Sequence, residues 1–240
     1  MERLSLSCLF LFLPQIILAD TAAPVRAPAR WSDCPIGTEV EYRSEKSMDE
    51  RVYDRWTEIS RVVRRDRKKT VLSIKIVSDD LRWKHESEEE HLVNPSRADI
   101  RSGFGPEKNL RKVGEETLTL AGRSIACSVL ENSEGGKSGR FWLALDSSRL
   151  PIEIVKSVIR KGEAVYEEVL TSWNDRISVS GRELRALQMK YSYTSDDFSV
   201  TSLTWLTRDV PGHMVRFHSV VKHGKIIHSQ ITQVVRFGPK

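Results

Sequence analysis

Apolar and polar residues alternate along several segments of this chain. Val40 and Tyr42 alternate with charged residues between positions 38 and 43, and Leu72 and Ile74 alternate with polar residues farther along. A period of two places successive side chains on opposite faces of an extended strand. The pattern predicts a mostly β protein built from antiparallel meander sheets, with a curved half-barrel as one form that such sheets take.

The segment 48–64 fits two patterns. Ser47 and Glu50 have the spacing of a helix capping box, and apolar residues follow at helical intervals. The same segment is rich in β-branched and aromatic residues, and the polar run at 64–69 leads into a clear strand pattern. We favour a long hairpin and keep a helix as the alternative. Another strand is expected between 81 and 92.

The second half of the chain contains an internal repeat. Each copy has a Gly-Arg pair, an alanine, a Trp-Leu pair, a proline, a valine and a turn glycine in the same order. The first copy is formed by Gly122, Arg123, Ala126, Trp142, Leu143, Pro151, Val155 and Gly162, and the second by Gly181, Arg182, Ala186, Trp205, Leu206, Pro211, Val215 and Gly224. The interval from proline to valine is identical. The repeat indicates a duplicated β unit, and chance resemblance between two meanders is the alternative.

The N-terminal residues predict export. Arg3 is followed by an apolar stretch that runs to Leu18 and ends at Ala19, which is the pattern of a signal peptide. This stretch is shorter than the roughly 20 residues that cross a bilayer as a helix. We therefore expect a periplasmic or extracellular protein after removal of residues 1–19.

The remaining patterns divide the exported part into five segments. Two prolines and three glycines without periodicity mark a long loop in the middle of the chain. The expected segments are a flexible leader at 20–34, an N-terminal β meander at 35–93, the long loop at 94–114, and two β repeat units at 115–176 and 177–240.

The charge balance is mildly basic, since 38 Lys and Arg residues stand against 33 Asp and Glu residues, for a net charge of +5. An exported protein meets anionic membrane surfaces and acidic glycans, so we expect no nucleic acid partner. The densest basic run is a candidate patch for an anionic envelope surface, with a solvated turn as the alternative; it contains Arg61, Arg64, Arg65, Arg67, Lys68 and Lys69.

Two cysteines, Cys34 and Cys127, remain after the predicted signal peptide. An oxidising compartment would allow a disulfide between them. The alternative is two separate thiols, with Cys127 as a small core residue of a strand.

Chemistry-bearing motifs are sparse. The pattern of the last hairpin, with a turn at His223-Gly224, predicts that His218 lies opposite or close to His228, which makes the pair a weak metal candidate. No third ligand is evident, so we predict no metal site and no cofactor. The sequence has no GxSxG motif and no cysteine near a histidine, so no catalytic residue is assigned.

The signal peptide, the long meander strands and the Trp-Leu, Pro, Val repeat resemble those of secreted bacterial β proteins and, more distantly, LolA-type periplasmic carriers. This resemblance covers residues 36–237 as a strand pattern and carries over no functional residue. It implies a curved sheet that holds acyl chains on a concave apolar face. Our leading hypothesis is a non-catalytic exported binding or scaffold domain for an apolar or lipid-like ligand. The alternatives are a hydrolase whose site only the fold assembles and a structural envelope interaction protein.

Overall fold

The computed structural model describes residues 31, 34–66, 69–92, 110–134, 136–147, 150–195 and 198–239. The predicted signal peptide, nearly all of the leader and most of the predicted loop at 94–114 lie outside these residues. The last residues of that loop segment are strand, because β5 already begins at Arg111.

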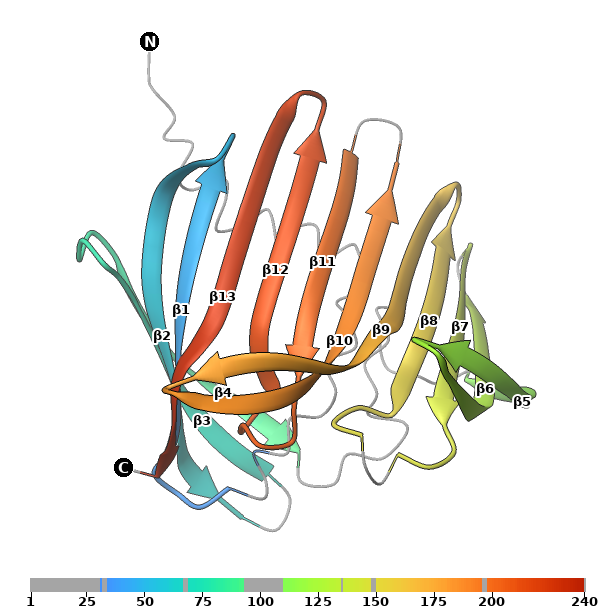
Figure 1. Ribbon diagram of the computed structural model, residues 1–240, viewed down its shortest axis with the longest axis horizontal. Helices are drawn as coiled ribbons and strands as arrows, with labels where there is room; N and C mark the ends of the chain where they lie inside the picture. The colour runs from blue at the N-terminus through green and yellow to red at the C-terminus, as the bar shows by residue number, and fades with distance from the viewer. Residues whose placement is uncertain are drawn as a thin grey trace.

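The described residues form one antiparallel sheet of 13 strands (Figure 1). The strands are β1 Thr38–Met48, β2 Arg51–Arg65, β3 Lys69–Ser78, β4 Lys84–Leu92, β5 Arg111–Leu120, β6 Arg123–Glu134, β7 Lys137–Ala144, β8 Ile154–Lys161, β9 Ala164–Val179, β10 Arg182–Thr194, β11 Phe198–Leu206, β12 Met214–His223 and β13 Ile226–Pro239.

The sheet is a meander interrupted at one place. Its order is β4-β3-β2-β1-β13-β12-β11-β10-β9-β8-β7-β6-β5, so every neighbour is consecutive in sequence except the pair of β1 and β13. The predicted fold class is confirmed, and residues 51–65 form a strand, which excludes the helix alternative. Among the described residues, no helix has the length and apolar character needed to cross a membrane.

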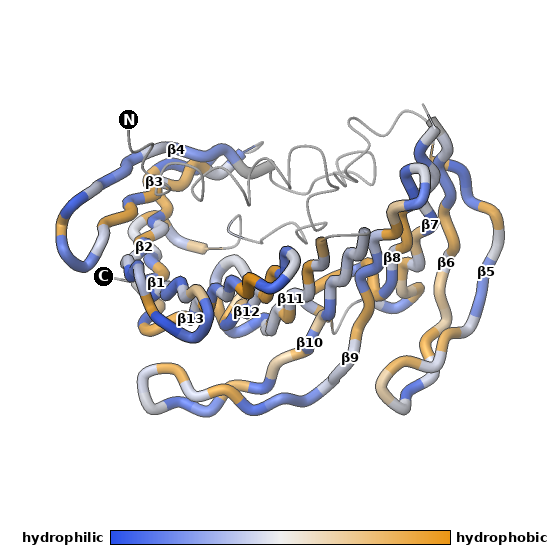
Figure 2. The backbone as a smooth tube through the Cα atoms, turned by 90° about the horizontal axis from the view of Figure 1, so that it is seen from above, coloured by the Kyte–Doolittle hydropathy of each residue, from blue (hydrophilic) through white to orange (hydrophobic). Residues whose placement is uncertain are grey.

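The sheet is strongly curved, with β3 and β4 bent over one end and β5 and β6 bent at the other (Figure 2). The tip of the β9–β10 hairpin crosses the lower ends of β12, β13 and β1 on the outer side of this curve (Figures 1 and 2). Ser180 Oγ donates to the Val235 carbonyl oxygen at 2.5 Å, and Gln233 Nε2 donates to the Ser178 carbonyl oxygen at 3.4 Å. These bonds fasten the tip to β13.

The segments β5–β8 and β9–β12 share their turn geometry. The first hairpin of each segment turns at a glycine with a positive φ angle, 77° at Gly122 and 76° at Gly181. Glycine adopts this left-handed conformation without steric cost. The following arginines lie over aromatic rings of the next segment, with Arg123 at 5.2 Å from the Trp173 ring centroid and Arg182 at 5.5 Å from that of Phe237.

The same two segments share a bulge. The strand register shifts directly after Trp142 and directly after Trp205, where β8 and β12 each contain one extra residue. Those extra residues are Val155 and Val215, both 0% exposed. A bulge bends its strand locally. The tryptophan, proline and valine of the sequence repeat therefore mark the same turn of the sheet in both segments.

Candidate functional site

A row of polar side chains crosses eight neighbouring strands from β8 to β2. Each member is the direct cross-strand partner of the next, and such partners point to the same face of a sheet. In order across the sheet, the row contains Ser157, Glu168, Tyr191, Ser202, Ser219, Gln230, Lys46 and Asp54. We call it the polar row.

The rows on either side of the polar row are more apolar. One flanking row consists of Ile159, Tyr166, Tyr193, Val200, Val221, His228 and Met48. The rings of Tyr166 and Tyr193 stack there with centroids 4.5 Å apart. The other flanking row is mixed and consists of Leu170, Met189, Thr204, Phe217, Thr232, Ser44 and Trp56. The polar row is thus continuous, whereas the rows beside it mix polar and apolar residues.

The polar row lies on the inner side of the curved sheet. Trp205 and Gln233 occupy positions of the opposite face, because each is an odd number of residues away from Ser202 or Gln230 on its strand. Both contact the β9–β10 hairpin, since Trp205 Nε1 donates to Asp175 Oδ2 at 2.6 Å and Gln233 donates to Ser178. That hairpin lies on the outer side (Figure 2).

The two ends of the polar row differ in charge. At one end, burial raises the pKa of Glu168 to about 7, and burial also raises the pKa of Tyr191 with help from the neighbouring Tyr166 and Glu168. At the other end, Lys46 is 8% exposed and its Nζ lies 5.1 Å from the Trp56 ring centroid. Burial lowers the pKa of Lys46, against the attraction of Asp54.

The centre of the row consists of neutral hydrogen-bonding groups. Ser202 Oγ donates to Ser219 Oγ at 2.9 Å, and the next row contains a Ser44 and Thr232 hydroxyl pair at the same distance. Each hydroxyl retains further donor or acceptor capacity beyond one such bond. The row is therefore suited to hydrogen-bonding an elongated polar group, with the Glu168 carboxyl near one end and the neighbouring Lys46 and Asp54 at the other.

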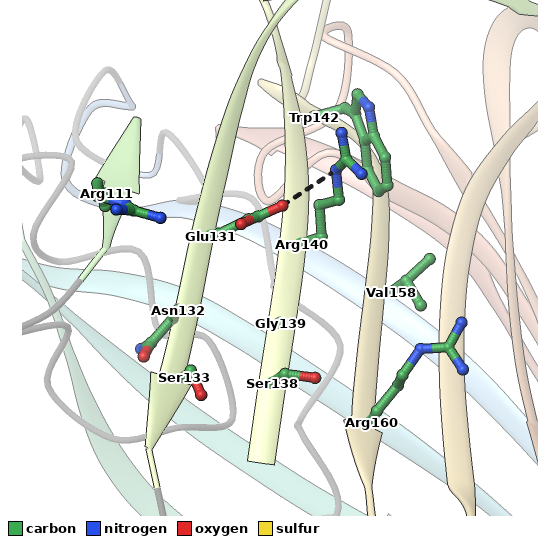
Figure 3. Close-up of a pocket in the computed structure, with 10 residues that line it drawn as sticks. All are labelled: Arg111, Glu131, Asn132, Ser133, Ser138, Gly139, Arg140, Trp142, Val158 and Arg160. Carbon is green, nitrogen blue, oxygen red and sulfur yellow. Dashed lines mark ion pairs between the residues drawn. The ribbon is translucent and has the colours of Figure 1, made fainter. Parts of the chain in front are cut away.

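A second candidate is a pocket of about 620 Å³ on the opposite face, over β5 to β8 (Figure 3). Its lining residues are Arg111, Glu131, Asn132, Ser133, Ser138, Gly139, Arg140, Trp142, Val158 and Arg160. The Arg140 side chain pairs with Glu131, Nε to Oε1 at 3.5 Å, and also with Glu116. Three arginines and one carboxylate make the lining electropositive.

The sides of the Trp142 ring are occupied by cations. The guanidinium carbon of Arg140 lies 5.1 Å from the ring centroid, and Lys156 Nζ lies 5.4 Å from it. The indole Nε1 donates to Glu116 Oε2 at 2.8 Å. Trp142 is 7% exposed. These contacts fix the position of Arg140 at the pocket.

The structure distributes the predicted basic run around the β2–β3 turn. Arg61 pairs with Glu39 at 2.5 Å, Lys69 pairs with Glu90 at 2.6 Å, and Arg65 donates to the Cys34 carbonyl oxygen at 3.2 Å. Arg64 is exposed, whereas Arg67 and Lys68 lie outside the described residues. Ion pairs therefore neutralise part of the charge that the sequence concentrates here.

Cys34 and Cys127 are both free thiols in this structure. Cys34 packs against the buried cluster that contains Trp31 and Val40, whereas Cys127 is 0% exposed in a separate cluster with Trp142. Burial raises the pKa of Cys127. The two cysteines belong to different parts of the core and form no disulfide with each other in this structure.

The prediction that His218 lies opposite His228 is wrong. His218 pairs with Ile231, and His228 pairs with Val221. His223 pairs with Ile226, so the turn consists of Gly224 and Lys225. A two-residue turn pairs each even-numbered residue of β12 with an odd-numbered residue of β13, and both histidines have even numbers. The histidines lie on opposite faces, and burial lowers the pKa of both.

No cluster of three or more potential metal ligands occurs among the described residues.

Sequence reasoning did not find the polar row. Its members come from eight strands and share no motif, so the only signal was a polar residue at a particular alternate position of each strand. Their alignment depends on the register of every neighbouring pair.

No protein-family model matches this sequence, and no curated protein matches it. Solved structures are distantly similar. A DUF1329 family protein from Desulfovibrio piger matches with a TM-score of 0.31 and 9% identity over 98% of this chain and 93% of that chain. Kievitone hydratase from Nectria haematococca matches with a TM-score of 0.25 and 8% identity over 90% of this chain and 95% of that chain.

MucB in complex with MucA(peri) matches with a TM-score of 0.19 and 12% identity, over 96% of this chain and 98% of that chain. Values this low describe a distant likeness of the β-sheet fold alone. They assign no ligand, activity or partner to this chain.

Proposed function

We propose that this chain is a non-catalytic exported binding protein that holds an amphipathic, lipid-like ligand on the inner face of its sheet. The observation that carries the proposal is the polar row, eight polar side chains in line between more apolar rows. Ligand sites combine mostly apolar surface with a few polar groups that fix orientation. The inner face has this composition.

The polar row changes the kind of ligand that we expect from the sequence, from apolar to amphipathic. A purely apolar ligand would cover the hydroxyl and amide groups of the row without using their remaining hydrogen-bonding capacity, and burying an unsatisfied polar group costs about 1–3 kcal/mol. An amphipathic ligand avoids this penalty, because its polar part can lie along the hydroxyl and amide groups while its apolar part contacts the flanking residues. Export rests on the predicted signal peptide.

Native mass spectrometry of the protein purified from its own envelope tests the proposal. We expect a co-purified ligand with one polar part and at least one alkyl chain. A Ser202→Val and Ser219→Val double variant removes two central hydroxyls and should retain at least tenfold less ligand.

Thr201→Val is the matched control, because Thr201 is the neighbour of Ser202 on the other face of β11 and is exposed. Circular dichroism spectra of all variants should overlay. If the wild-type protein retains no ligand, or if the double variant and the control retain equal amounts, the inner face is not the binding site.

A further inference from the structure

Two of the three arginines that line the pocket over β5 to β8 form no ion pair with another described residue. Arg140 is held by Glu131 and Glu116. Arg111 and Arg160 are exposed, and neither side chain forms an ion pair or hydrogen bond with another described residue. The lining therefore holds three guanidinium groups and one carboxylate, that of Glu131, which is the cross-strand partner of Arg111 and pairs with Arg140.

The two similar segments, β5–β8 and β9–β12, differ at Arg140 and Arg160. Trp142 faces Lys156 across the strands, as Trp205 faces Arg216, which aligns the two segments residue by residue. Two residues before each tryptophan, Arg140 aligns with Leu203. Four residues after Lys156 and Arg216, Arg160 aligns with Val220.

The cation that covers the tryptophan ring is present in both segments, as Lys156 at 5.4 Å from the Trp142 centroid and as Arg216 at 5.2 Å from that of Trp205. Arg140 is a second cation on the same ring and has no charged counterpart in the second segment. The scaffold tolerates leucine and valine where the pocket has arginines. The strand pairing that the two segments share is therefore compatible with uncharged residues in place of Arg140 and Arg160.

We propose that this pocket binds the phosphate group of a ligand, with Arg111 and Arg160 as its main contacts. Guanidinium groups form paired hydrogen bonds with phosphate oxygens. Ser133 and Ser138, cross-strand partners in the lining, supply additional hydroxyl donors. Arg140 adds positive charge and is held in place by Glu131.

The size of the pocket indicates more than a bare ion. Its volume of about 620 Å³ lies in the range of small-molecule sites, roughly 300–1,000 Å³. The phosphate group can belong to a soluble small molecule or to the head group of a phospholipid. These two sources share the same recognition chemistry and differ in the surface that must approach the pocket.

Binding measurements with two probes test the proposal on the full mature protein. Isothermal titration with inorganic phosphate measures recognition of the free anion, and co-sedimentation with phosphatidylglycerol vesicles measures recognition of a head group. An Arg111→Gln and Arg160→Val double variant should bind the effective probe at least tenfold more weakly. The valine copies the residue of the second segment, so folding should be preserved.

Arg185→Gln is the matched control, because Arg185 is an exposed arginine in β10 outside the pocket. If the double variant loses phosphate binding and the control does not, the result supports a soluble ligand. If the double variant loses vesicle binding and the control does not, the result supports a phospholipid head group. Absence of binding to either probe, or equal loss in the control, overturns the proposal. The outcome is independent of the inner-face ligand, because the pocket lies on the opposite face.

Discussion

Trp142 and Trp205 make the same hydrogen bond in two successive segments of one sheet. The indole of Trp142 donates to Glu116 at 2.8 Å, and that of Trp205 donates to Asp175 at 2.6 Å. Each carboxylate lies on the first strand of its segment, six residues before the glycine of the first hairpin turn, which is Gly122 or Gly181. Each bond therefore joins the first strand of a segment to the third.

Replacing either of these tryptophans by phenylalanine should lower the free energy of unfolding by about 1–3 kcal/mol, because a hydrogen bond to a charged carboxylate is lost. Urea denaturation measures the change. Trp83→Phe is the control, since Trp83 precedes β4 and contacts the Trp56 ring at 6.3 Å. Equal losses in all three variants would show that ring size, and not the hydrogen bond, determines the effect.

Gly212 should be intolerant of a side chain. Its φ angle is 77°, and a Cβ atom there would lie 3.0 Å from Trp31 Nε1. Trp31 is 4% exposed, so its ring cannot move away freely. Gly212→Ala should therefore raise the backbone energy and displace the ring, with a loss of about 2–3 kcal/mol.

Gly224→Ala separates these two effects. Gly224 has a φ angle of 57°, and a Cβ atom at this position would meet nothing within 4 Å. The variant should lose only about 1 kcal/mol, from the left-handed backbone conformation. Thermal unfolding of both variants tests the difference, and equal melting temperatures would exclude a steric role for Trp31.

Glu168 should make stability depend on pH. Its pKa in the folded protein is about 7, above the ordinary value of 4.5. The folded state thus binds a proton more tightly than the unfolded state, so stability is greatest below pH 4.5 and falls as the pH rises to 7. The loss from this one group should reach about 3 kcal/mol.

Glu168→Gln should remove this decline and stabilise the protein at pH 8. Glu167→Gln is the control, because Glu167 lies on the other face of β9 and pairs with Lys156 at 3.2 Å. Urea denaturation between pH 4.5 and 8 gives the two profiles. A Glu168→Gln profile that still declines like that of the wild-type protein would contradict the assignment.

Replacement of Cys127 by alanine should be tolerated. Cys127 is the cross-strand partner of Glu116, and Ala186 is that of Asp175, so the second segment already contains alanine at the matching position. Cys127→Ala should cost about 1 kcal/mol, from the loss of one small buried group. In the native wild-type protein, Cys127 should react with thiol reagents only after unfolding, and a mass spectrum showing loss of two hydrogens would contradict the free thiols.

The sequence by itself determined the strands. Alternation of apolar and polar residues is a local property of an extended chain, so it correctly predicted the meander and the strand at 51–65. The turn glycines expected at Gly162 and Gly224 do have positive φ angles, a conformation that favours glycine. The duplication that the repeated residues suggest stays a prediction. The helical spacing at 48–64 was overridden by pairing of β2 with β1 and β3.

Only the tertiary structure decided which side chains meet. The pairing of β1 with β13 joins the first and last described strands and brings Lys46 beside Gln230. The two-residue turn between His223 and Ile226 placed His218 and His228 on opposite faces. Register is a relation between strands and has a period of two, so each pairing selects one of two faces, and only the assembled sheet aligns eight polar residues into one row.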